Sequence, residues 1–170
     1  SVKLLKSSSF DEIEKVIQDA LKLGTDNDFG HEYHKDALSR FEIINRSPIT
    51  TGWDRMDEIC KGGLGNNELG VVIAPTGAGK SMVLVHLACQ ALKQGKTVVY
   101  YTLELKDTAV GNRFDSCLTG ISLNEHKERQ EEILEKIKDI EGSLIIKEYP
   151  TKSASVQTIK NHIEKLKKRG

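Results

Sequence analysis

The sequence predicts an α/β fold in which a parallel sheet is covered by helices on both faces. Short apolar runs alternate with longer segments whose apolar residues recur at helical spacing. The strand-like runs are apolar at consecutive positions, which is typical of strands buried on both faces. A glycine-rich turn also joins the first of these runs directly to a helix-like segment. The chain of 170 residues is long enough to bury a sizeable core.

Residues 1–45 are predicted to form a helical arm or linker, and residues 46–170 the globular part. Ser9 and Glu12 have the spacing of a capping box, and Gly24 is well placed to end the helix that the box begins. A short second helix is expected over about 31–44. The apolar face of the first helix consists of Phe10, Ile13, Val16, Ile17, Ala20 and Leu21.

The globular part is expected to alternate strand and helix. We predict strands at Val71–Ala74, Thr97–Leu103 and Ser143–Lys147, with helices at Lys80–Gln94 and Thr108–Leu118. A second capping box, Ser122 with Glu125, is expected to begin a helix whose inner face carries Ile133, Leu134, Ile137 and Ile140. The last helix places its apolar residues on one side: Val156, Ile159, Ile163 and Leu166.

Composition excludes several classes of protein. Lys plus Arg and Asp plus Glu both number 25, so overall charge gives no sign of nucleic-acid binding. The three cysteines, Cys60, Cys89 and Cys117, are far apart and odd in number, which argues against a disulfide framework or a zinc site. We find neither a signal peptide nor a membrane-length apolar run. These observations predict a protein of a reducing cytoplasm, without membrane contact.

The turn between the first strand and the first globular helix has the chemistry of a phosphate-binding loop. Gly77 and Gly79 allow backbone N–H groups to approach phosphate oxygens at a helix N-terminus. Lys80 would reach the β- and γ-phosphates, and the Ser81 hydroxyl would bind Mg²⁺. Alanine replaces the first glycine of the usual pattern, but a methyl group is tolerable at a strand end. The predicted nucleotide-binding residues are Ala74, Pro75, Thr76, Gly77, Ala78, Gly79, Lys80, Ser81 and Met82.

Glu104 is the candidate general base. It follows the second predicted strand, at the carboxyl edge of the sheet, where ligands bind in open α/β folds. A carboxylate there could orient and deprotonate a water that attacks the γ-phosphate. The alternative is a solvated glutamate at the end of a strand.

From Thr50 onward the sequence resembles the RecA-like ATPase domain of the DnaB family of hexameric replicative DNA helicases, in particular its phage members. The segment "TTGWDRMDEICKGGL" is similar to the family's opening motif, and "APTGAGKS" to its phosphate loop, which commonly begins with alanine. "TLEL" is similar to the segment that carries the family's catalytic glutamate, here Glu104, and Arg113 falls where these helicases carry an arginine. The final stretch, "LIIKEYPTKSASVQTIKNHIEKLKKRG", resembles the part that precedes the Walker B strand.

The resemblance implies an ATP- and Mg²⁺-dependent motor in which a ring of subunits moves single-stranded DNA. Lys80 and Glu104 would be its catalytic residues, and Ser81 would hold the metal. The helical arm would pack on an adjacent subunit and help to hold the ring together, or else on its own core. Primase and a helicase loader are further expected partners, in a bacterial or phage-infected cytoplasm. The Walker B strand, DNA-binding loops and arginine finger are expected beyond Gly170.

Two rival functions stay open. One is another RecA-like ATPase, either a strand-exchange recombinase or a circadian-clock-type ATPase, which shares the fold and the loop. The other is a non-catalytic nucleotide-binding or interaction module. A missing Walker B aspartate would favour the module for this polypeptide, while the resemblance favours the helicase.

Weaker signals have simpler interpretations. His31, Glu32 and His34 lack metalloprotease spacing and suit a polar surface turn. The basic run Lys165, Lys167, Lys168 and Arg169 is better explained by the dipole of a helix C-terminus than by DNA contact. We assign three residues with apolar neighbours to the core, and leave open whether Trp53 lies near the nucleotide or anchors a turn. The three are His86, Cys89 and Cys117.

Overall fold

The computed structural model describes residues 13–17, 20–21, 30–41 and 46–169. They form two compact units: residues 45–151 make up one, and the described residues before 45 join 152–169 in the other. The first unit carries the sheet and the phosphate loop, so we call it the sheet unit. None of the described helices is long and apolar enough to span a membrane.

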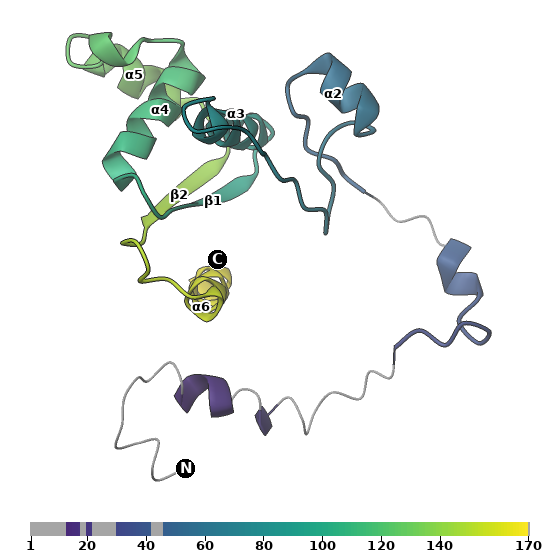
Figure 1. Ribbon diagram of the computed structural model, residues 1–170. Helices are drawn as coiled ribbons and strands as arrows, with labels where there is room; N and C mark the ends of the chain where they lie inside the picture. Colours follow the sequence, from purple (N-terminus) through teal and green to yellow (C-terminus); the bar gives the residue numbers. More distant parts are fainter. Residues whose placement is uncertain (1–12, 18–19, 22–29, 42–45, 170) are drawn as a thin grey trace. The chain divides into compact units, whose positions relative to one another are not determined.

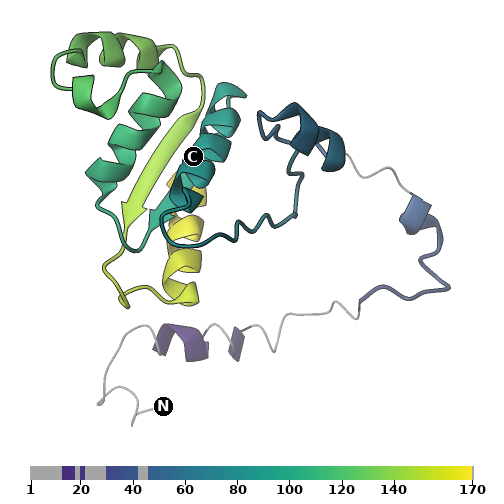
Figure 2. The ribbon, with the colours of Figure 1, turned by 45° about the horizontal axis from the view of Figure 1, so that its top comes forward.

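The sheet unit contains a parallel pair of strands. β1, Thr97–Thr102, pairs with β2, Ser143–Glu148, in a register that runs from Thr97 opposite Ser143 to Thr102 opposite Glu148. α3, Lys80–Lys93, precedes β1, and α4, Asp107–Thr119, follows it. Figure 1 shows the two strands side by side with α3 and α4 across one face, and the turned view in Figure 2 agrees. These elements confirm the predicted alternation of strand and helix and the predicted parallel sheet.

The core lies between the sheet and the two helices. Val85, Cys89 and Leu92 of α3 are nearly inaccessible to solvent, and they pack against Val110 and Phe114 of α4. Their spacing along α3 is that of a single helical face. Alternate residues of the strands complete the core: Val98, Tyr100, Leu144 and Ile146.

The first predicted strand, Val71–Ala74, was predicted wrongly, because this segment has no strand conformation in the structure. Val71 is 70% exposed and Ile73 is 90% exposed. A strand requires hydrogen bonds from a neighbouring strand. Within the described residues, β1 pairs only with β2, so the 71–74 segment has no strand beside it.

The capping box of Ser122 and Glu125 forms, but it opens a short 3-10 turn, η3 (Leu123–Glu125), and not the predicted long helix. The helix itself, α5, covers Gln130–Lys138. Leu134 was predicted to face inward and is 55% exposed, whereas Ile133 is buried. Ile133 and Ile137 lie four residues apart on one face, and Leu134 lies about 100° around the helix from Ile133.

Before α3 the described part of the sheet unit has one short helix, α2, Asp54–Ile59, which was not predicted. It lies inside an irregular stretch, residues 46–68, which we call the braced segment. An antiparallel bridge between Ile49 and Leu64 closes this stretch upon itself.

In the second unit, α6 covers Val156–Arg169, as predicted. Residues 13–17 and 20–21 are helical, and the Asn161 amide of α6 donates to a Glu14 carboxylate oxygen at 3.3 Å. The capping residues Ser9 and Glu12 lie outside the described residues. The predicted helix over 31–44 is shorter than expected: the described part holds a turn and the 3-10 helix η2, Leu38–Phe41.

Candidate phosphate-binding site

The phosphate loop folds as a tight turn that leads directly into α3. Gly77 has a φ of +81° and Gly79 a φ of +91°, both in the left-handed region that favours glycine. A Cβ added at either glycine would meet nothing within 4 Å, so open space lies over the loop. Gly79 is the N-cap of α3 and no described side chain caps that helix. The loop therefore presents an uncapped helix N-terminus, which is the backbone arrangement that binds phosphate.

Lys80 folds back over its own loop. Its ammonium group donates to the carbonyl oxygens of Ala74 at 2.9 Å and of Pro75 at 2.8 Å. Among the described residues, the ammonium group thus has no carboxylate partner at the loop. Phosphate oxygens would make stronger, charge-assisted bonds in place of these two carbonyls. Ala74 contributes its carbonyl oxygen and not its side chain, which explains why a methyl group is tolerated at this position.

The other predicted nucleotide-binding residues lie along the same turn. The Ala78 N–H donates to the Pro75 carbonyl at 3.2 Å and closes the turn. The Met82 N–H donates to the Gly79 carbonyl at 2.9 Å, within the first turn of α3. Thr76 is exposed and Ser81 is half-buried in that first turn. The structure therefore brings all of the predicted residues from Ala74 to Met82 together in one loop and helix start.

Glu104 lies in a turn at the carboxyl end of β1 that hydrogen bonds between Thr102 and Leu105 hold in place. We call residues 102–105 the pinned turn. The Thr102 hydroxyl donates to the Leu105 carbonyl at 2.8 Å and accepts from the Leu105 N–H at 3.0 Å. The Thr151 hydroxyl also donates to the Leu103 carbonyl at 3.3 Å. The Glu104 side chain is exposed and makes no hydrogen bond to any described residue. The turn holds Glu104 in place, but its carboxylate does not contact the phosphate loop.

Arg113, the arginine that follows Glu104, lies in α4 beside the core. Burial raises the pKa of the Tyr100 hydroxyl, and the nearby Arg113 charge partly offsets that rise. Tyr100 itself packs edge-on against Phe114, with ring centroids 5.4 Å apart. Arg113 therefore lies near Tyr100 of β1, the strand that ends at Thr102, two residues before Glu104.

The braced segment contains a carboxylate-centred cluster that the sequence did not reveal. Asp57 accepts hydrogen bonds from the hydroxyls of Thr50 and Thr51, and from the Thr51 N–H at 2.7 Å. These bonds hold the pKa of the Asp57 carboxyl below its usual value of 3.8, with the Thr50 hydroxyl as the largest cause. Sequence comparison placed these residues in one motif, but gave no sign of the hydrogen bonds that join them.

A guanidinium-centred cluster holds the other end of the braced segment. Arg46 donates to the carbonyls of Cys60, Lys61 and Gly63, each at 2.7 Å, and forms a two-pronged ion pair with Glu68. Hydrogen bonding by Arg46 lowers the pKa of the Glu68 carboxyl to about 2. The planar fork of arginine suits a carboxylate partner of this kind.

Trp53 and His86 contact each other, which corrects the interpretation of His86 as an apolar core residue. Their rings are stacked, with centroids 4.2 Å apart and planes 19° apart. His86 Nε2 also lies 2.8 Å from the Thr51 carbonyl oxygen. A carbonyl can only accept, so Nε2 carries the proton and donates. Trp53 therefore joins the braced segment to α3, which agrees with its predicted role as an anchor of the turn.

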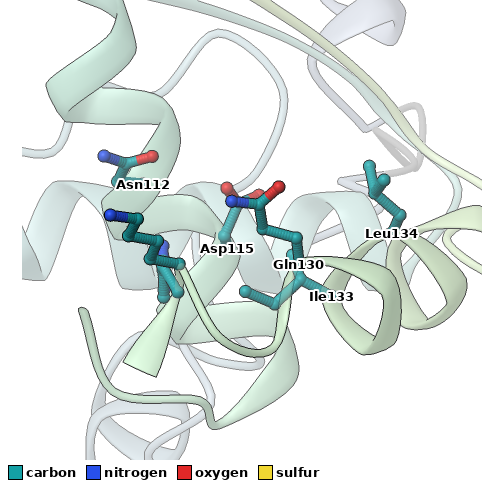
Figure 3. Close-up of a pocket in the computed structure, with 7 residues that line it drawn as sticks. Asn112, Asp115, Gln130, Ile133 and Leu134 are labelled. Atoms are coloured by element: carbon teal, nitrogen blue, oxygen red, sulfur yellow. The ribbon is translucent and has the colours of Figure 1, made fainter. Parts of the chain in front are cut away.

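The sheet unit also contains two hollows. An apolar groove of about 980 Å³ is bordered by the braced segment, the 69–72 segment, one side of α3 and β1. A polar pocket of about 300 Å³ lies between α4 and α5; Figure 3 shows Asn112 and Asp115 reaching it from α4, and Gln130 from α5. Burial raises the pKa of the Asp115 carboxyl there, and His126 partly offsets the rise.

Comparison with known proteins agrees with this geometry. Residues 48–170 match the family described as the DnaB-like helicase C-terminal domain. The chain is 28% identical over 167 residues to a DnaB-like replicative helicase of Enterobacteria phage T4. That match covers 91% of this chain and 35% of the phage protein, so the chain spans about a third of that relative. The α/β architecture is accordingly part of a RecA-like fold, and the chain belongs to the DnaB-like helicase C-terminal domain family.

Proposed function

We propose that this chain is the nucleotide-binding part of an ATP-driven motor of a replicative DNA helicase, which unwinds duplex DNA by moving along a single strand. The observation that carries the proposal is the phosphate loop. In the described part of the chain, no side chain caps its helix start, its two left-handed glycines leave space above it, and backbone carbonyls alone hold Lys80 at the loop. These are the features that a triphosphate requires. Membership of the DnaB-like family supports the motor function.

Each site residue has a distinct role in this proposal. Lys80 exchanges its two carbonyl contacts for the β- and γ-phosphate oxygens. Ser81 supplies a hydroxyl ligand for Mg²⁺, which neutralises phosphate charge when it is bound. Glu104 orients the attacking water and accepts its proton. The pinned turn at Thr102 and Leu105 keeps Glu104 at the carboxyl edge of β1, where such a base is useful.

The wider assembly follows from the family and from the helical arm. Single-stranded DNA is the proposed track, and primase or a helicase loader are proposed partners. Ring assembly through the arm is supported by the exposure of its apolar residues, with Ile17 54% and Leu21 64% exposed. Replacing Ile13 and Ile17 by aspartate in the complete protein should weaken its self-association and leave nucleotide affinity intact. Light scattering would test this, and an unchanged oligomer would contradict it.

Equilibrium binding of a fluorescent ATP analogue with Mg²⁺ tests the proposal most directly. We expect the wild-type chain to bind, and Lys80→Ala to lose a charge-assisted contact of about 1.5–3 kcal/mol. At 1.4 kcal/mol per factor of ten, the affinity should fall roughly tenfold or more. Equal affinity of the variant and the wild type would contradict the assignment of the loop.

ATP turnover with and without single-stranded DNA separates the motor from a second candidate, a non-catalytic nucleotide-binding module. The second candidate is favoured by one observation, that the Glu104 carboxylate makes no contact with the loop in this chain. We expect binding without turnover by the chain alone, and turnover in the complete protein. Glu104→Gln should leave binding intact and stop turnover there; surviving hydrolysis would exclude Glu104 as the base.

A further inference from the structure

The braced segment contacts one face of α3, the helix that begins at the phosphate loop. His86 donates to the Thr51 carbonyl at 2.8 Å, and the Trp53 ring stacks on the His86 ring. Gly52 lies against the Gln90 side chain of α3, where an added Cβ would be 2.6 Å from the side-chain amide nitrogen. His86 and Gln90 are four residues apart and therefore share a helical face. We call the contact of Thr51 and Trp53 with His86 the clamp.

The clamp is preorganised on the side of the braced segment. Asp57 holds the Thr51 N–H at 2.7 Å and the Thr51 hydroxyl at 2.7 Å. The Trp53 N–H is directed towards the Thr51 hydroxyl at 3.3 Å. The Thr51 carbonyl is consequently presented to His86 by a peptide whose other polar groups are already bonded.

The clamp also brackets the phosphate loop along the chain. Thr51 precedes the loop, His86 follows it, and the two are 35 residues apart in sequence. On a second face, about 100° around the helix, α3 is held by the core through Val85 and Leu92. The segment directly before the loop adds little support, because Ile73 is 90% exposed. The clamp and the core together therefore determine how freely the loop and the start of α3 can move.

We propose that the clamp is a positioning device for the phosphate loop, so that clamp closure and nucleotide binding stabilise each other. This inference rests on the proposed nucleotide site. Closing the 35-residue loop removes conformational freedom that a bound triphosphate would otherwise have to remove. The coupling is reciprocal: breaking the clamp weakens nucleotide binding, and nucleotide binding favours the closed clamp by the same factor. None of the clamp side chains needs to touch the nucleotide.

Trp53 is the only tryptophan of the chain, so its fluorescence reports the state of the clamp. A saturating concentration of Mg·ADP should change the Trp53 emission of the wild-type chain. This change in emission should vanish in His86→Ala, because that variant lacks the stacked ring. It should also vanish in Lys80→Ala at Mg·ADP concentrations too low for that variant to bind. An emission that does not respond to bound nucleotide in the wild type would overturn the proposal.

The coupling also predicts that breaking the clamp weakens nucleotide binding. The affinity for a fluorescent ADP analogue tests this effect. Trp53→Ala and His86→Ala should each weaken binding by about fivefold or more, which lies in the range of typical coupling between sites. The double variant should be no weaker than either single variant, because both break the same clamp. Trp53→Phe keeps a stacking ring and should restore most of the affinity. The matched control is Tyr33→Ala, which removes another aromatic–histidine contact, with His34, and should leave affinity unchanged.

The possible results distinguish a failure of the proposed nucleotide site from a failure of the clamp. If the wild-type chain fails to bind nucleotide, the proposed function and the clamp fall together. If the wild type binds, Lys80→Ala binds more weakly, and Trp53→Ala binds as well as the wild type, the clamp alone is wrong. If circular dichroism shows that Trp53→Ala does not fold, the clamp can still be tested in other ways. These are the nucleotide affinities of Trp53→Phe and His86→Gln and the Trp53 emission of the wild type. Wild-type affinity in His86→Gln, together with an unresponsive Trp53, would then overturn the clamp.

Discussion

Leu92 and Leu69 belong to two regions that are equally apolar in sequence and differ completely in structure. Leu92 lies in α3 and is 1% exposed, whereas Leu69, in the segment that leads to the phosphate loop, is 87% exposed. α3 packs on β1 and on α4, while the 69–72 segment only borders the apolar groove beside β1. Burial of an apolar side chain is favourable, but the side chain is buried only where neighbouring elements pack against it.

Of the substitutions that compare these two regions, Leu92→Ala should cause the largest loss in free energy of unfolding. Its side chain is packed against the core that includes Val110 and Phe114. Removing a fully buried leucine side chain loses its transfer free energy and leaves a cavity, at a cost of about 2–5 kcal/mol. Urea unfolding followed by circular dichroism would measure the loss. A loss below about 1 kcal/mol would mean that the α3–α4 core is less tightly packed than the structure indicates.

Gly63→Ala should cause the second-largest loss of stability, because Gly63 lies where two backbone stretches of the braced segment approach each other closely. Gly63 has a φ of +113°, and an added Cβ would lie 1.9 Å from the Ile49 carbonyl oxygen. We expect a loss on the order of 3 kcal/mol, the sum of backbone strain and displacement of the Ile49–Leu64 bridge.

Gly120→Ala is the matched control for Gly63→Ala. Gly120 ends α4 with a φ of +75°, and an added Cβ there would meet nothing within 4 Å. Only the strain of the left-handed conformation remains, about 1–2 kcal/mol. Equal losses for the two variants would show that the close approach at Gly63 relaxes without cost.

Acid should loosen the braced segment before it affects the core. The pKa of Glu68 is lowered from 4.5 to about 2 by Arg46, and that of Asp57 lies below 3.8. Because the pKa of Glu68 is lower in the folded chain, the unfolded chain binds a proton first as the pH falls. The contribution of Glu68 to the free energy of unfolding is therefore fully present above pH 4.5, its pKa in the unfolded chain, and is lost as the pH drops from about 4.5 towards 2.

Unfolding measured by Trp53 fluorescence across that pH range would check the effect of acid. Glu68→Gln cannot lose a proton, so it should flatten the pH dependence between 4.5 and about 2. Added salt should weaken the effect, because both Arg46 and Glu68 are partly exposed. A wild-type profile that stays flat over this interval would show that the ion pair does not stabilise the segment.

The sequence was sufficient to predict the elements whose evidence is local. Thr97–Leu103 was expected as a strand and β1 is Thr97–Thr102; the helix predicted from Lys80 is α3. The tight turn that leads into α3 was also predictable, because Gly77 and Gly79 lie close together directly before the helix.

What could not be predicted depends on partners that are distant in the chain. Val71–Ala74 has the composition of a strand, but pairing is a property of two segments, and composition describes one. The contact between Trp53 and His86 joins residues on either side of the loop, and no periodicity marks it. The hydrogen bonds of Asp57 reach back to Thr50 and Thr51, a distance along the chain that neither a helix nor a strand pattern would suggest.

Leu69→Ala should have the smallest effect and completes the comparison, since it is chemically the same change as Leu92→Ala. Exposed side chains away from specific interactions alter stability by no more than about 0.5 kcal/mol, and Leu69 is 87% exposed. The same urea measurement would serve. A loss that approaches that of Leu92→Ala would show that the 69–73 segment is covered in solution. Sedimentation at several protein concentrations would then show whether a second copy covers it, because burial between two copies depends on concentration and burial within one chain does not.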